Sequence, residues 1–506
     1  MSDQQAVIDF LAAPSTHGGA AVTRVDTHAA SVFLAGPHAL KIKRAVRFPF
    51  LDFTTLEKRK AACEAELAVN RPYAPAIYKR VVAITREADG FLALGGTGKP
   101  VEWAVEMARF DENATLDHLA PRGAVDAALA DKLGRAVAAA HEAAAPAQDF
   151  RFADALVDIV TQNDSELRGS PALFSPDAIA ALTQKTRTAL DRIRPLLKAR
   201  ERDGFVRRCH GDLHLGNIVR IDGAPVLFDA IEFDDRIATA DVFYDLAFLL
   251  MDLIERDLAP AAAIVLNRYL VARARDDDFD ALAALPLFLS VRAAIRAKVT
   301  AARAAHAEDR AEAERSARDY FTLARTLIDP PAAQLLAVGG LSGTGKSVLA
   351  AALAAHVPPP PGAVVLRSDV IRKQLMGAAE TERLPPEAYS AEVTARVYAA
   401  IAERARRVLA AGHSAIADAV YARASERATI AQAAGGARFH GLFLTADLAT
   451  RVARVGARLA DASDADPGIA RQQEGYDLGH VDWDEIDASG SPADTLARSR
   501  VALERG

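Results

Sequence analysis

One compact stretch of the chain holds three side chains whose types suit phosphoryl transfer. It reads HGDLHLGNIVRIDGAPVLFDAIEFDD and contains Asp212, Asn217 and Asp229. The dipeptide DG between two apolar runs predicts a two-residue β-hairpin turn. Pairing outward from this turn places Asn217 opposite Phe228, so we expect Asp229 to lie beside Asn217. A carboxylate and an amide oxygen next to a second carboxylate, Asp212, predict a Mg²⁺–phosphate site with a base beside it.

A second pattern, GLSGTGKS (340–347), predicts a phosphate-binding loop. It fits G-x-x-x-x-G-K-[ST] and lies between the apolar strand LLAV (335–338) and the helical segment VLAAALAAHV. In such a loop the backbone N–H groups converge on phosphate, the lysine reaches the terminal phosphates, and the hydroxyl binds Mg²⁺. The predicted ATP-binding residues are Gly340, Ser342, Gly343, Thr344, Gly345, Lys346 and Ser347, of which Ser347 also binds Mg²⁺.

The tetrapeptide GTGK occurs a second time, in LALGGTGKPVEW, and there it fails the same test. Around Lys99 the first glycine position holds Ala93, and the Ser/Thr position holds Pro100. The sequence that follows is typical of a strand, so no helix N-terminus points at an anion. This copy is predicted to be a hairpin loop.

Two further acids end predicted strands after the phosphate-binding loop. AVVLRSD ends at Asp369, and SAIAD ends at Asp418. Ligands of open α/β sheets bind at the carboxyl ends of the strands. Both carboxylates are therefore expected near Lys346 and Ser347.

The stretch around Asp212 resembles the catalytic core of the aminoglycoside phosphotransferase (choline-kinase-like) family, a branch of the protein-kinase-like fold. H-x-D-L-x-x-x-N has the spacing of the kinase catalytic loop. The resemblance implies that Asp212 is the catalytic base, and that Asn217 and Asp229 are Mg²⁺ ligands. His210 would support the loop, and the acids of DVFYDLAFLLMDL (241–253) would tie it down. The likeness covers about residues 20–325.

This family also needs a strand lysine for the α- and β-phosphates and a helix acid that orients it. Lys41 and Lys43 lie on the same face of one predicted strand, so periodicity does not separate them, and the similarity of ALKIK to VAIK favours Lys41. The acid is one of three residues, of which the last is favoured: Glu57, Glu64 and Glu66. No G-x-G-x-x-G precedes the lysine strand, and THAASVFLAG would cover the phosphates. A solvated charged face is the alternative for these residues.

The second half resembles small P-loop kinases such as the polynucleotide kinase, zeta-toxin and chloramphenicol phosphotransferase group. Asp369 and Arg372 in SDVIRKQL match their D-x-x-R. The resemblance implies that Asp369 accepts the hydroxyl proton, that Arg372 binds phosphate or substrate, and that Asp418 supports the metal. The alternative for Asp369 is helix N-capping.

An arginine-bearing segment, TRVARVGARLADASDAD (450–466), follows in this half. Arg451, Arg454 and Arg458 lie on one helix face. The pattern resembles the lid of small-molecule kinases, in which guanidinium groups neutralise the transferring phosphoryl group. Arg454 and Arg458 are accordingly predicted to bind ATP, whereas an exposed amphipathic helix is the alternative.

The elements that position these residues divide into two predicted domains. Residues 1–328 form an α+β, protein-kinase-like bilobal domain, with a small lobe at about 20–112 and a helical lobe at about 113–328. The proline pair in LIDPPAAQLL marks the break. Residues 333–506 alternate strands with amphipathic helices, which predicts an α/β P-loop domain with a parallel sheet.

Bulk properties limit the partners. The 506 residues are 51% hydrophobic and 25% charged, and the net charge of −6 offers no general field for nucleic acid or an anionic membrane. No apolar run is long enough to span a bilayer. Two cysteines and the absence of a signal-peptide pattern indicate a reducing, cytoplasmic setting.

The pairing of the two halves resembles bacterial proteins described as bifunctional aminoglycoside phosphotransferase/ATP-binding proteins. It predicts an ATP- and Mg²⁺-dependent enzyme with two nucleotide sites that phosphorylates a hydroxyl of a small molecule. The rival hypothesis is a nucleotide-binding regulator, with a P-loop switch and a pseudokinase domain. A third, a nucleic-acid-end kinase, conflicts with the acidic charge balance. Neither the acceptor nor the oligomeric state follows from the sequence.

Overall fold

The computed structural model describes the whole chain except residues 1–2, 49–50, 305–306, 308, 458–460 and 506. The fold divides into two compact units, which are described separately below. The first consists of Met1–Ala136, Ala140–Phe152 and Lys198–Leu249, and the second of Val137–Ala139, Ala153–Leu197 and Leu250–Gly506.

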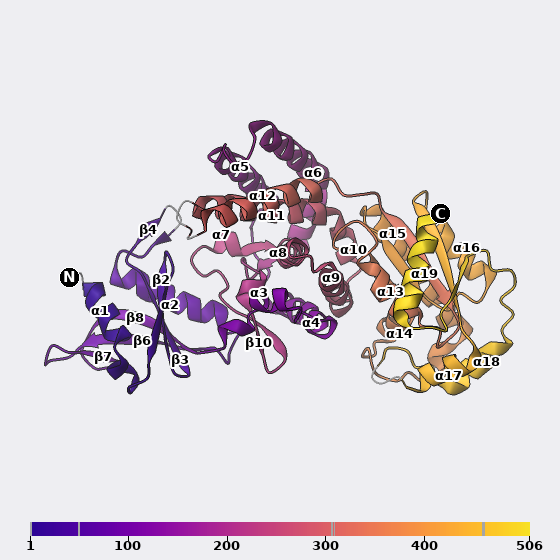
Figure 1. The fold of residues 1–506 in the computed structure, drawn as a ribbon, viewed down its shortest axis with the longest axis horizontal. Helices are drawn as coiled ribbons and strands as arrows, with labels where there is room; N and C mark the ends of the chain where they lie inside the picture. Colours follow the sequence, from indigo (N-terminus) through magenta and orange to yellow (C-terminus); the bar gives the residue numbers. More distant parts are fainter. Residues whose placement is uncertain (1–2, 49–50, 305–306, 308, 458–460, 506) are drawn as a thin grey trace. The chain divides into compact units, whose positions relative to one another are not determined.

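The first unit begins with an antiparallel sheet of order β1-β2-β3-β8-β6-β7 (Figure 1). Helix α2 (Leu56–Asn70) packs against β3, β6 and β8, and α1 (Asp3–Ala12) contributes Val7 and Leu11 to a buried apolar cluster of the sheet. Residues on both faces of β2 and β3 are buried, and the two strands pair antiparallel, with Ala30 opposite Lys43 and Ala35 opposite His38. The strands are β1 (Val22–Asp26), β2 (Ala30–Ala35), β3 (His38–Lys43), β6 (Tyr78–Arg86), β7 (Leu92–Leu94) and β8 (Lys99–Ala108), and a separate pair is formed by β4 (Arg47–Phe48) and β5 (Leu51–Asp52).

The first GTGK lies in this sheet and is a hairpin loop, as predicted. It connects β7 to β8, which begins at Lys99, and no helix follows it. The Gly98 amide donates a hydrogen bond to Glu87 Oε1 at 3.1 Å, so a side chain of the neighbouring strand end satisfies this loop. The context of the tetrapeptide therefore distinguishes the two copies.

The predicted hairpin of the catalytic stretch is also confirmed. Strands β10 (Ile218–Ile221) and β11 (Ala224–Leu227) pair antiparallel with Ile221 opposite Ala224. The Phe228 amide donates to the Asn217 carbonyl at 3.0 Å, which extends the register to the expected pair. Helix α3 contacts β10 of this hairpin. The bounds of the nearby elements in the sequence are α3 (Leu116–Leu119), α4 (Ala127–Ala143), β9 (Val206–Arg208), the 3₁₀ helix η4 (Leu215–Asn217), α7 (Asp235–Ala238) and β12 (Thr239–Asp241).

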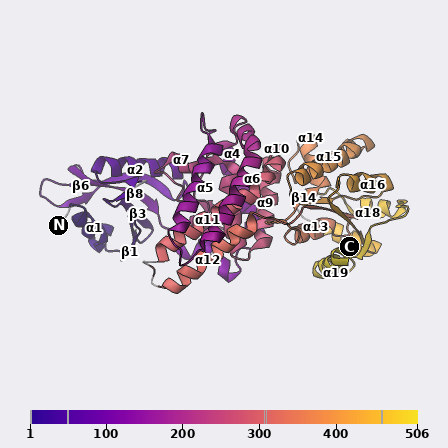
Figure 2. The same cartoon turned by 90° about the horizontal axis from the view of Figure 1, so that it is seen from above.

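The middle of the chain is helical, as its alanine-rich sequence predicts. Helices α11 and α12 pack against each other, and Ser290 Oγ donates to the Ala324 carbonyl across them at 2.8 Å (Figure 2). The helices are α5 (Phe152–Arg168), α6 (Pro176–Arg202), α8 (Val242–Glu255), α9 (Ala259–Arg273), α10 (Asp277–Ala281), α11 (Leu285–Ala304) and α12 (Arg310–Leu327). Among the helices in the described ranges, none is both long enough and apolar enough to cross a membrane.

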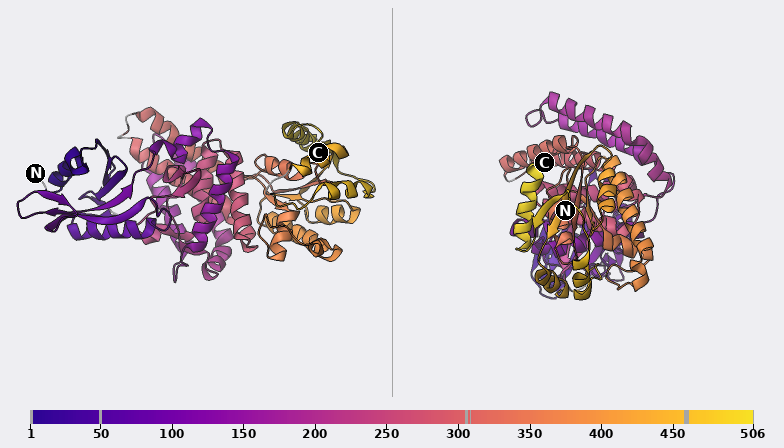
Figure 3. Two further views of the ribbon diagram at one scale, coloured as in Figure 1. Left: turned by 90° about the horizontal axis from the view of Figure 1, so that it is seen from below. Right: turned by 90° about the vertical axis from the view of Figure 1, so that its right-hand side faces the viewer.

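The last part of the second unit is a parallel sheet of order β14-β15-β13-β16-β17, as the sequence predicted. Helices flank this sheet (Figure 3). The strands are β13 (Gln334–Gly340), β14 (Val364–Arg367), β15 (Ala415–Asp418), β16 (Arg438–Thr445) and β17 (Asp484–Asp487). The helices are α13 (Lys346–Ala354), α14 (Ser368–Met376), α15 (Ala391–Ala410), α16 (Ala424–Gln432), α17 (Leu448–Gly456), α18 (Pro467–Gln472) and α19 (Pro492–Arg505).

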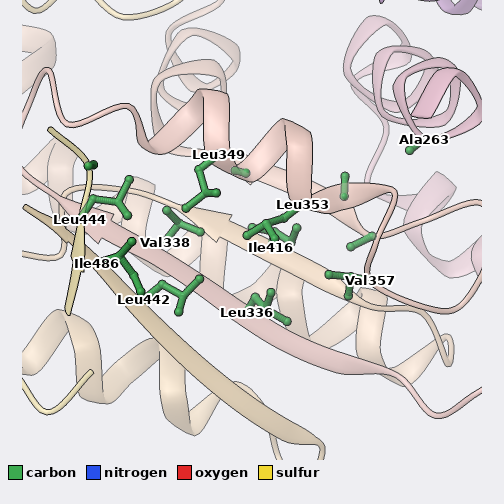
Figure 4. Close-up of a cluster of buried hydrophobic side chains, with 14 residues drawn as sticks. Ala263, Leu336, Val338, Leu349, Leu353, Val357, Ile416, Leu442, Leu444 and Ile486 are labelled. Atoms are coloured by element: carbon green, nitrogen blue, oxygen red, sulfur yellow. The ribbon is translucent and has the colours of Figure 1, made fainter. Parts of the chain in front are cut away.

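A buried apolar cluster fixes the helix that follows the phosphate-binding loop onto this sheet (Figure 4). Leu349 and Leu353 of α13 pack against Val338 and Ile416 of the central strands. Each of these buried side chains contributes about 1.5–3 kcal/mol. The packing therefore holds the N-terminus of α13 at the carboxyl edge of the sheet.

The predicted break between the two domains lies between α12, which ends at Leu327, and β13, which begins at Gln334. It falls inside the second compact unit, and the boundary between the compact units lies within the helical middle of the chain. The domain limits 1–328 and 333–506 stay a prediction.

Candidate active sites

The lysines of β3 share one buried carboxylate. Lys41 Nζ lies 2.8 Å from Glu66 Oε1, and Lys43 Nζ lies 2.7 Å from Glu66 Oε2. Glu57 and Glu64, the other two candidates on α2, are exposed. Of the three candidate acids, Glu66 is therefore the one that contacts the lysines. Both lysines reach it, as expected for two residues on one strand face.

Their second partners separate the two lysines. Lys41 Nζ lies 2.8 Å from Asp229 Oδ1, whereas Lys43 pairs with Glu232. Lys41 is thus the lysine adjacent to the predicted metal ligand. The role of Lys41 with the phosphates of ATP stays a prediction.

Charge pairing keeps these groups ionised. Burial alone would raise the pKa of Glu66, but Lys41 and then Lys43 hold it below its usual range. Burial alone would lower the pKa of Lys41, but Asp229 and Glu66 hold it well above its usual range. The site therefore presents fixed positive and negative charges around neutral pH.

Asp212 and Asn217 are joined within the catalytic loop. Asn217 Nδ2 donates to the Asp212 carbonyl at 2.9 Å and to Asp212 Oδ2 at 3.0 Å. The Asn217 amide thereby directs its nitrogen at the candidate base, and its oxygen stays available as a metal ligand. His214 Nδ1 accepts from the Gly216 amide at 3.1 Å, which places the ring proton on Nε2, 3.4 Å from Asp212 Oδ2. The sequence analysis did not single out His214.

Asp229 has the left-handed backbone conformation, with φ of 59°. Its amide donates to the Tyr78 hydroxyl at 3.1 Å. A non-glycine residue in this region costs on the order of 1 kcal/mol or more, and such strain concentrates at functional sites. The adjacent Phe228 pairs with Asn217, so the hairpin brings both predicted metal ligands to one end of the turn.

Residues beneath the loop support it. Burial lowers the pKa of His210, which leaves the ring neutral, and His210 Nε2 lies 2.9 Å from the Phe228 carbonyl. Asp245 accepts from the Gly211 amide at 2.9 Å and lies 3.1 Å from His141 Nε2. The contacts of His210 and Asp245 agree with the supporting roles that the family resemblance implied. Asp241 pairs instead with Arg200, through Nε at 2.6 Å, and its tie to the loop stays a prediction.

The glycines of the phosphate-binding loop have a positive φ, which glycine adopts readily. Gly343 has φ of 91°, and a Cβ built there would lie 2.4 Å from the Arg451 carbonyl oxygen. Gly345, with φ of 95°, precedes α13. Lys346 Nζ donates to the Leu341 carbonyl at 3.1 Å, and so folds back over the loop.

Asp418 lies at the end of β15 beside this loop. It is 2% exposed, and burial raises the pKa of its carboxyl, an effect that Lys346 and Arg367 oppose. Ser347 hydrogen-bonds to it. Among the described residues, its Oδ2 has no hydrogen-bond partner. A carboxylate beside the loop hydroxyl with an unpartnered buried oxygen fits an oxygen-ligated divalent cation such as Mg²⁺.

Asp369 and Arg372 differ in how far the protein's own groups already engage them. Asp369 is half-buried in the first turn of α14, and the N-cap position is Arg367, so the N-capping alternative for Asp369 is wrong. Arg372 Nη1 donates to the Ala388 carbonyl at 2.7 Å, and its guanidinium lies 4.8 Å from the Tyr389 ring centroid. The Arg372 contact with substrate stays a prediction, as does the catalytic role of Asp369.

The arginine-bearing segment is tied to protein groups. Arg451 Nε donates to the Ser342 carbonyl at 3.1 Å, and Arg454 Nη1 donates to the Ala488 carbonyl at 2.8 Å. Arg458 lies outside the described residues. Gln473 Oε1 accepts from the Ser342 amide at 2.6 Å, a contact that has no local signature in the sequence. ATP binding by Arg454 and Arg458 stays a prediction.

Family models match two separate stretches of the chain. Residues 57–285 match the model of the Phosphotransferase enzyme family, and residues 335–475 match that of an AAA domain. Uncharacterized proteins of Mycobacterium tuberculosis and Mycobacterium bovis are each 29% identical over 404 residues, which cover 78% of this chain and 77% of the relative.

Several solved structures are similar to a portion of this chain. A choline/ethanolamine kinase family protein from Mesorhizobium loti is 16% identical, with coverage of 65% of this chain and 95% of that chain and a TM-score of 0.40. An aminoglycoside phosphotransferase from Alicyclobacillus acidocaldarius is 13% identical, with coverage of 62% and 94% and a TM-score of 0.35. A gluconokinase from Sinorhizobium meliloti is 21% identical, with coverage of 34% and 92% and a TM-score of 0.25.

Proposed function

We propose that this chain, which joins a kinase-like phosphotransferase domain to a P-loop AAA domain, holds two ATP sites and transfers the γ-phosphoryl group to a hydroxyl of a small molecule. The matched families support phosphotransferase activity. To this activity the proposal adds two points: that the chain has two ATP sites, and that the acceptor group is an alcohol.

In the first site, Asp212 takes the proton of the acceptor hydroxyl. The hydroxyl oxygen bonds to the γ-phosphorus, the bond to the β–γ bridging oxygen breaks, and ADP leaves. Lys41, oriented by Glu66, binds the α- and β-phosphates. Asn217 and Asp229 would hold Mg²⁺, which neutralises charge on the phosphates when it is bound.

In the second site, the loop of residues 340–347 holds the phosphates, and Lys346 reaches the terminal groups. Asp369 takes the acceptor proton, which its half-buried place in the first turn of α14 allows. Ser347 would hold Mg²⁺ with Asp418 in support. Arg372 contacts the acceptor or the phosphoryl group. Catalysis in both sites is positioning and charge neutralisation rather than covalent chemistry.

One observation carries the proposal: Lys41 lies 2.8 Å from both Glu66 and Asp229. These three residues come from a strand, a helix and the segment after the hairpin. A strand lysine paired with a helix acid, next to the proposed metal-binding acid, is an arrangement that an active kinase requires, and it supports the kinase proposal for the first site.

The rival hypothesis, a nucleotide-dependent regulator, is favoured by one feature. The turn between β1 and β2 contains Thr27, His28 and Ala29 and no glycine. A backbone without glycine approaches phosphates less closely.

The test is mass spectrometry of a cell extract incubated with ATP and the protein. We expect new species heavier by one phosphoryl group, and Asp212→Asn and Lys346→Ala should each remove part of them. The matched controls are Asp222→Asn at the exposed hairpin turn and Lys99→Ala in the other GTGK, and both should behave as wild type. Unchanged products in both site variants would reject the double-kinase proposal, and loss only in Lys346→Ala would favour the regulator.

A further inference from the structure

Arg367 stands at the ligand-binding edge of the parallel sheet. It is the last residue of β14 and pairs in register with Asp418, the last residue of β15. Asp369, the proposed base, follows two positions later in the sequence. Since ligands of open α/β sheets bind at this edge, Arg367 is placed to contact a ligand of the P-loop site. No motif in the sequence singled it out.

The Arg367 guanidinium pairs with a carboxylate from a segment that is distant in the sequence. Arg367 Nη2 donates to Asp461 Oδ1 at 2.5 Å. The side chains are 19% and 32% exposed, respectively, so solvent reaches the pair. Asp461 Oδ1 also accepts from the Ser463 amide at 2.8 Å. A second anion that reaches the guanidinium would compete with Asp461 for Arg367 Nη2.

Two buried polar atoms beside this ion pair have no hydrogen-bond partner in the described part of the chain. They are Arg367 Nε and Asp418 Oδ2, which lie 3.9 Å apart. At this separation they attract each other as opposite charges but form no hydrogen bond. Arg367 thus retains a buried donor that the described residues do not satisfy.

We infer that Arg367 binds an anionic group of the acceptor, and that Asp461 takes the place of this group when the acceptor is absent. The inference rests on the proposed function of the P-loop site and extends it. The acceptor carries a phosphate or a carboxylate in addition to its hydroxyl. Both groups can present two oxygens to the planar guanidinium fork, whereas the Asp461 carboxylate contacts Arg367 through Oδ1.

An anionic oxygen could also come from the γ-phosphate of ATP. The acceptor is the favoured source because Lys346 and the loop amides already serve the nucleotide. Arg367 also lies on the strand that leads into the proposed base, Asp369. The two sources are separated by the experiment below.

The experiment titrates inorganic phosphate into the full-length chain by calorimetry. A Lys346→Ala background weakens the phosphate-binding loop, so that the titration reports the Arg367 site. We expect Asp461→Asn to tighten phosphate binding about tenfold, equivalent to about 1.4 kcal/mol, and Arg367→Gln to abolish it. The matched control is Arg383→Gln. It breaks an exposed ion pair of 3.5 Å with Asp466, which lies five residues after Asp461. It should leave phosphate affinity unchanged.

Equal phosphate affinity in Asp461→Asn and its parent would overturn the inference. Asn has the same shape as Asp, and the side chain of residue 461 is partly exposed. Asp461→Asn is therefore expected to fold, and it tests the site even if Arg367→Gln does not fold. In the chain with Lys346 intact, Arg367→Gln should change the affinity for a non-hydrolysable ATP analogue by less than about twofold. A tenfold loss would assign the anion to the nucleotide and overturn the acceptor assignment.

Failure of the proposed function has a different signature. A wild-type chain that binds no ATP analogue would reject the P-loop kinase proposal. Analogue binding together with unchanged phosphate affinity in Asp461→Asn would reject only the anionic acceptor. The phosphate titration decides the Arg367 site in either case.

Discussion

The two candidate sites are built in different ways. The first assembles Lys41, Glu66 and Asp229 from elements far apart in the sequence, and direct ion pairs join them. The second is a continuous loop whose lysine folds back on its own backbone, and whose Ser342 is bonded by Arg451 and Gln473. The first site therefore depends on buried charge pairing, and the second on loop geometry and on the segment that covers it.

The largest effect should come from removing the shared acid of the first site. Glu66→Ala leaves Lys41 and Lys43 buried without their common partner, which costs about 3–5 kcal/mol. We expect a matching loss in urea denaturation and no measurable transfer by the first site. Glu64→Ala, on the exposed face of the same helix, is the control. Equal stability of the two variants would contradict the charge-pairing account.

Acid should separate the two regions. Burial lowers the pKa of His413 to about 4, and its Nε2 lies 2.8 Å from the Gly362 carbonyl. Because the folded pKa lies below the unfolded value of 6.5, the neutral ring stabilises the fold above pH 6.5, and about 3 kcal/mol is lost between pH 6.5 and 4. The pKa of Glu66 is also lowered, so its contribution persists until the pH falls below the usual glutamate range.

Thermal unfolding followed from pH 7 to pH 4.5 should therefore show the P-loop region losing stability as His413 is protonated. The first region also contains a buried histidine with a lowered pKa, His210, so variants rather than the wild-type profile separate the two regions. His413→Gln keeps a donor for Gly362 without a titrating ring and should flatten this dependence. His356→Gln, at an exposed position, should not. Identical pH profiles for His413→Gln and wild type would remove this distinction between the regions.

Loop geometry is tested by two glycines with similar backbone angles. Gly343→Ala places a Cβ 2.4 Å from the Arg451 carbonyl oxygen, whereas Gly345→Ala meets nothing within 4 Å and suffers only backbone strain. We expect nucleotide affinity of the second site to fall about 100-fold in Gly343→Ala, and by about tenfold in Gly345→Ala. Calorimetry with an ATP analogue measures both. A larger loss at Gly345 would show that strain, rather than the contact with Arg451, governs the loop.

The smallest expected difference separates the two lysines of the first site. Lys41→Met should lower kcat/KM for ATP by about 100-fold, because Lys41 also contacts Asp229. Lys43→Met should lower it by about tenfold, since Lys43 pairs with Glu232 instead. Steady-state kinetics in a Lys346→Ala background isolates this site. The reverse order would assign the phosphate contact to Lys43.

The sequence predicted what is local. The DG turn set the register of Asn217 and Phe228, because a two-residue hairpin leaves no freedom of pairing. The P-loop and the parallel sheet followed from glycine spacing and strand–helix alternation. The alternation of residues along the strand could not decide between Lys41 and Lys43, because both lie on one strand face. Only their long-range partners differ.

Contacts between distant segments were not predictable. Gln473 on Ser342 and Asp461 on Arg367 join positions more than 90 residues apart, without a local signature. Arg372 fits the D-x-x-R spacing, but the fold also engages it with the Ala388 carbonyl. Spacing specifies residue types at a site, whereas tertiary packing decides which of them remain available to a ligand.

The central claim is that one chain carries two separate nucleotide sites. Its most direct test is the stoichiometry of binding of a non-hydrolysable ATP analogue in the presence of Mg²⁺, measured by calorimetry on the full-length protein. The account predicts two equivalents for the wild type and one for Lys346→Ala. One equivalent in the wild type, and none after the Lys346 substitution, would contradict it.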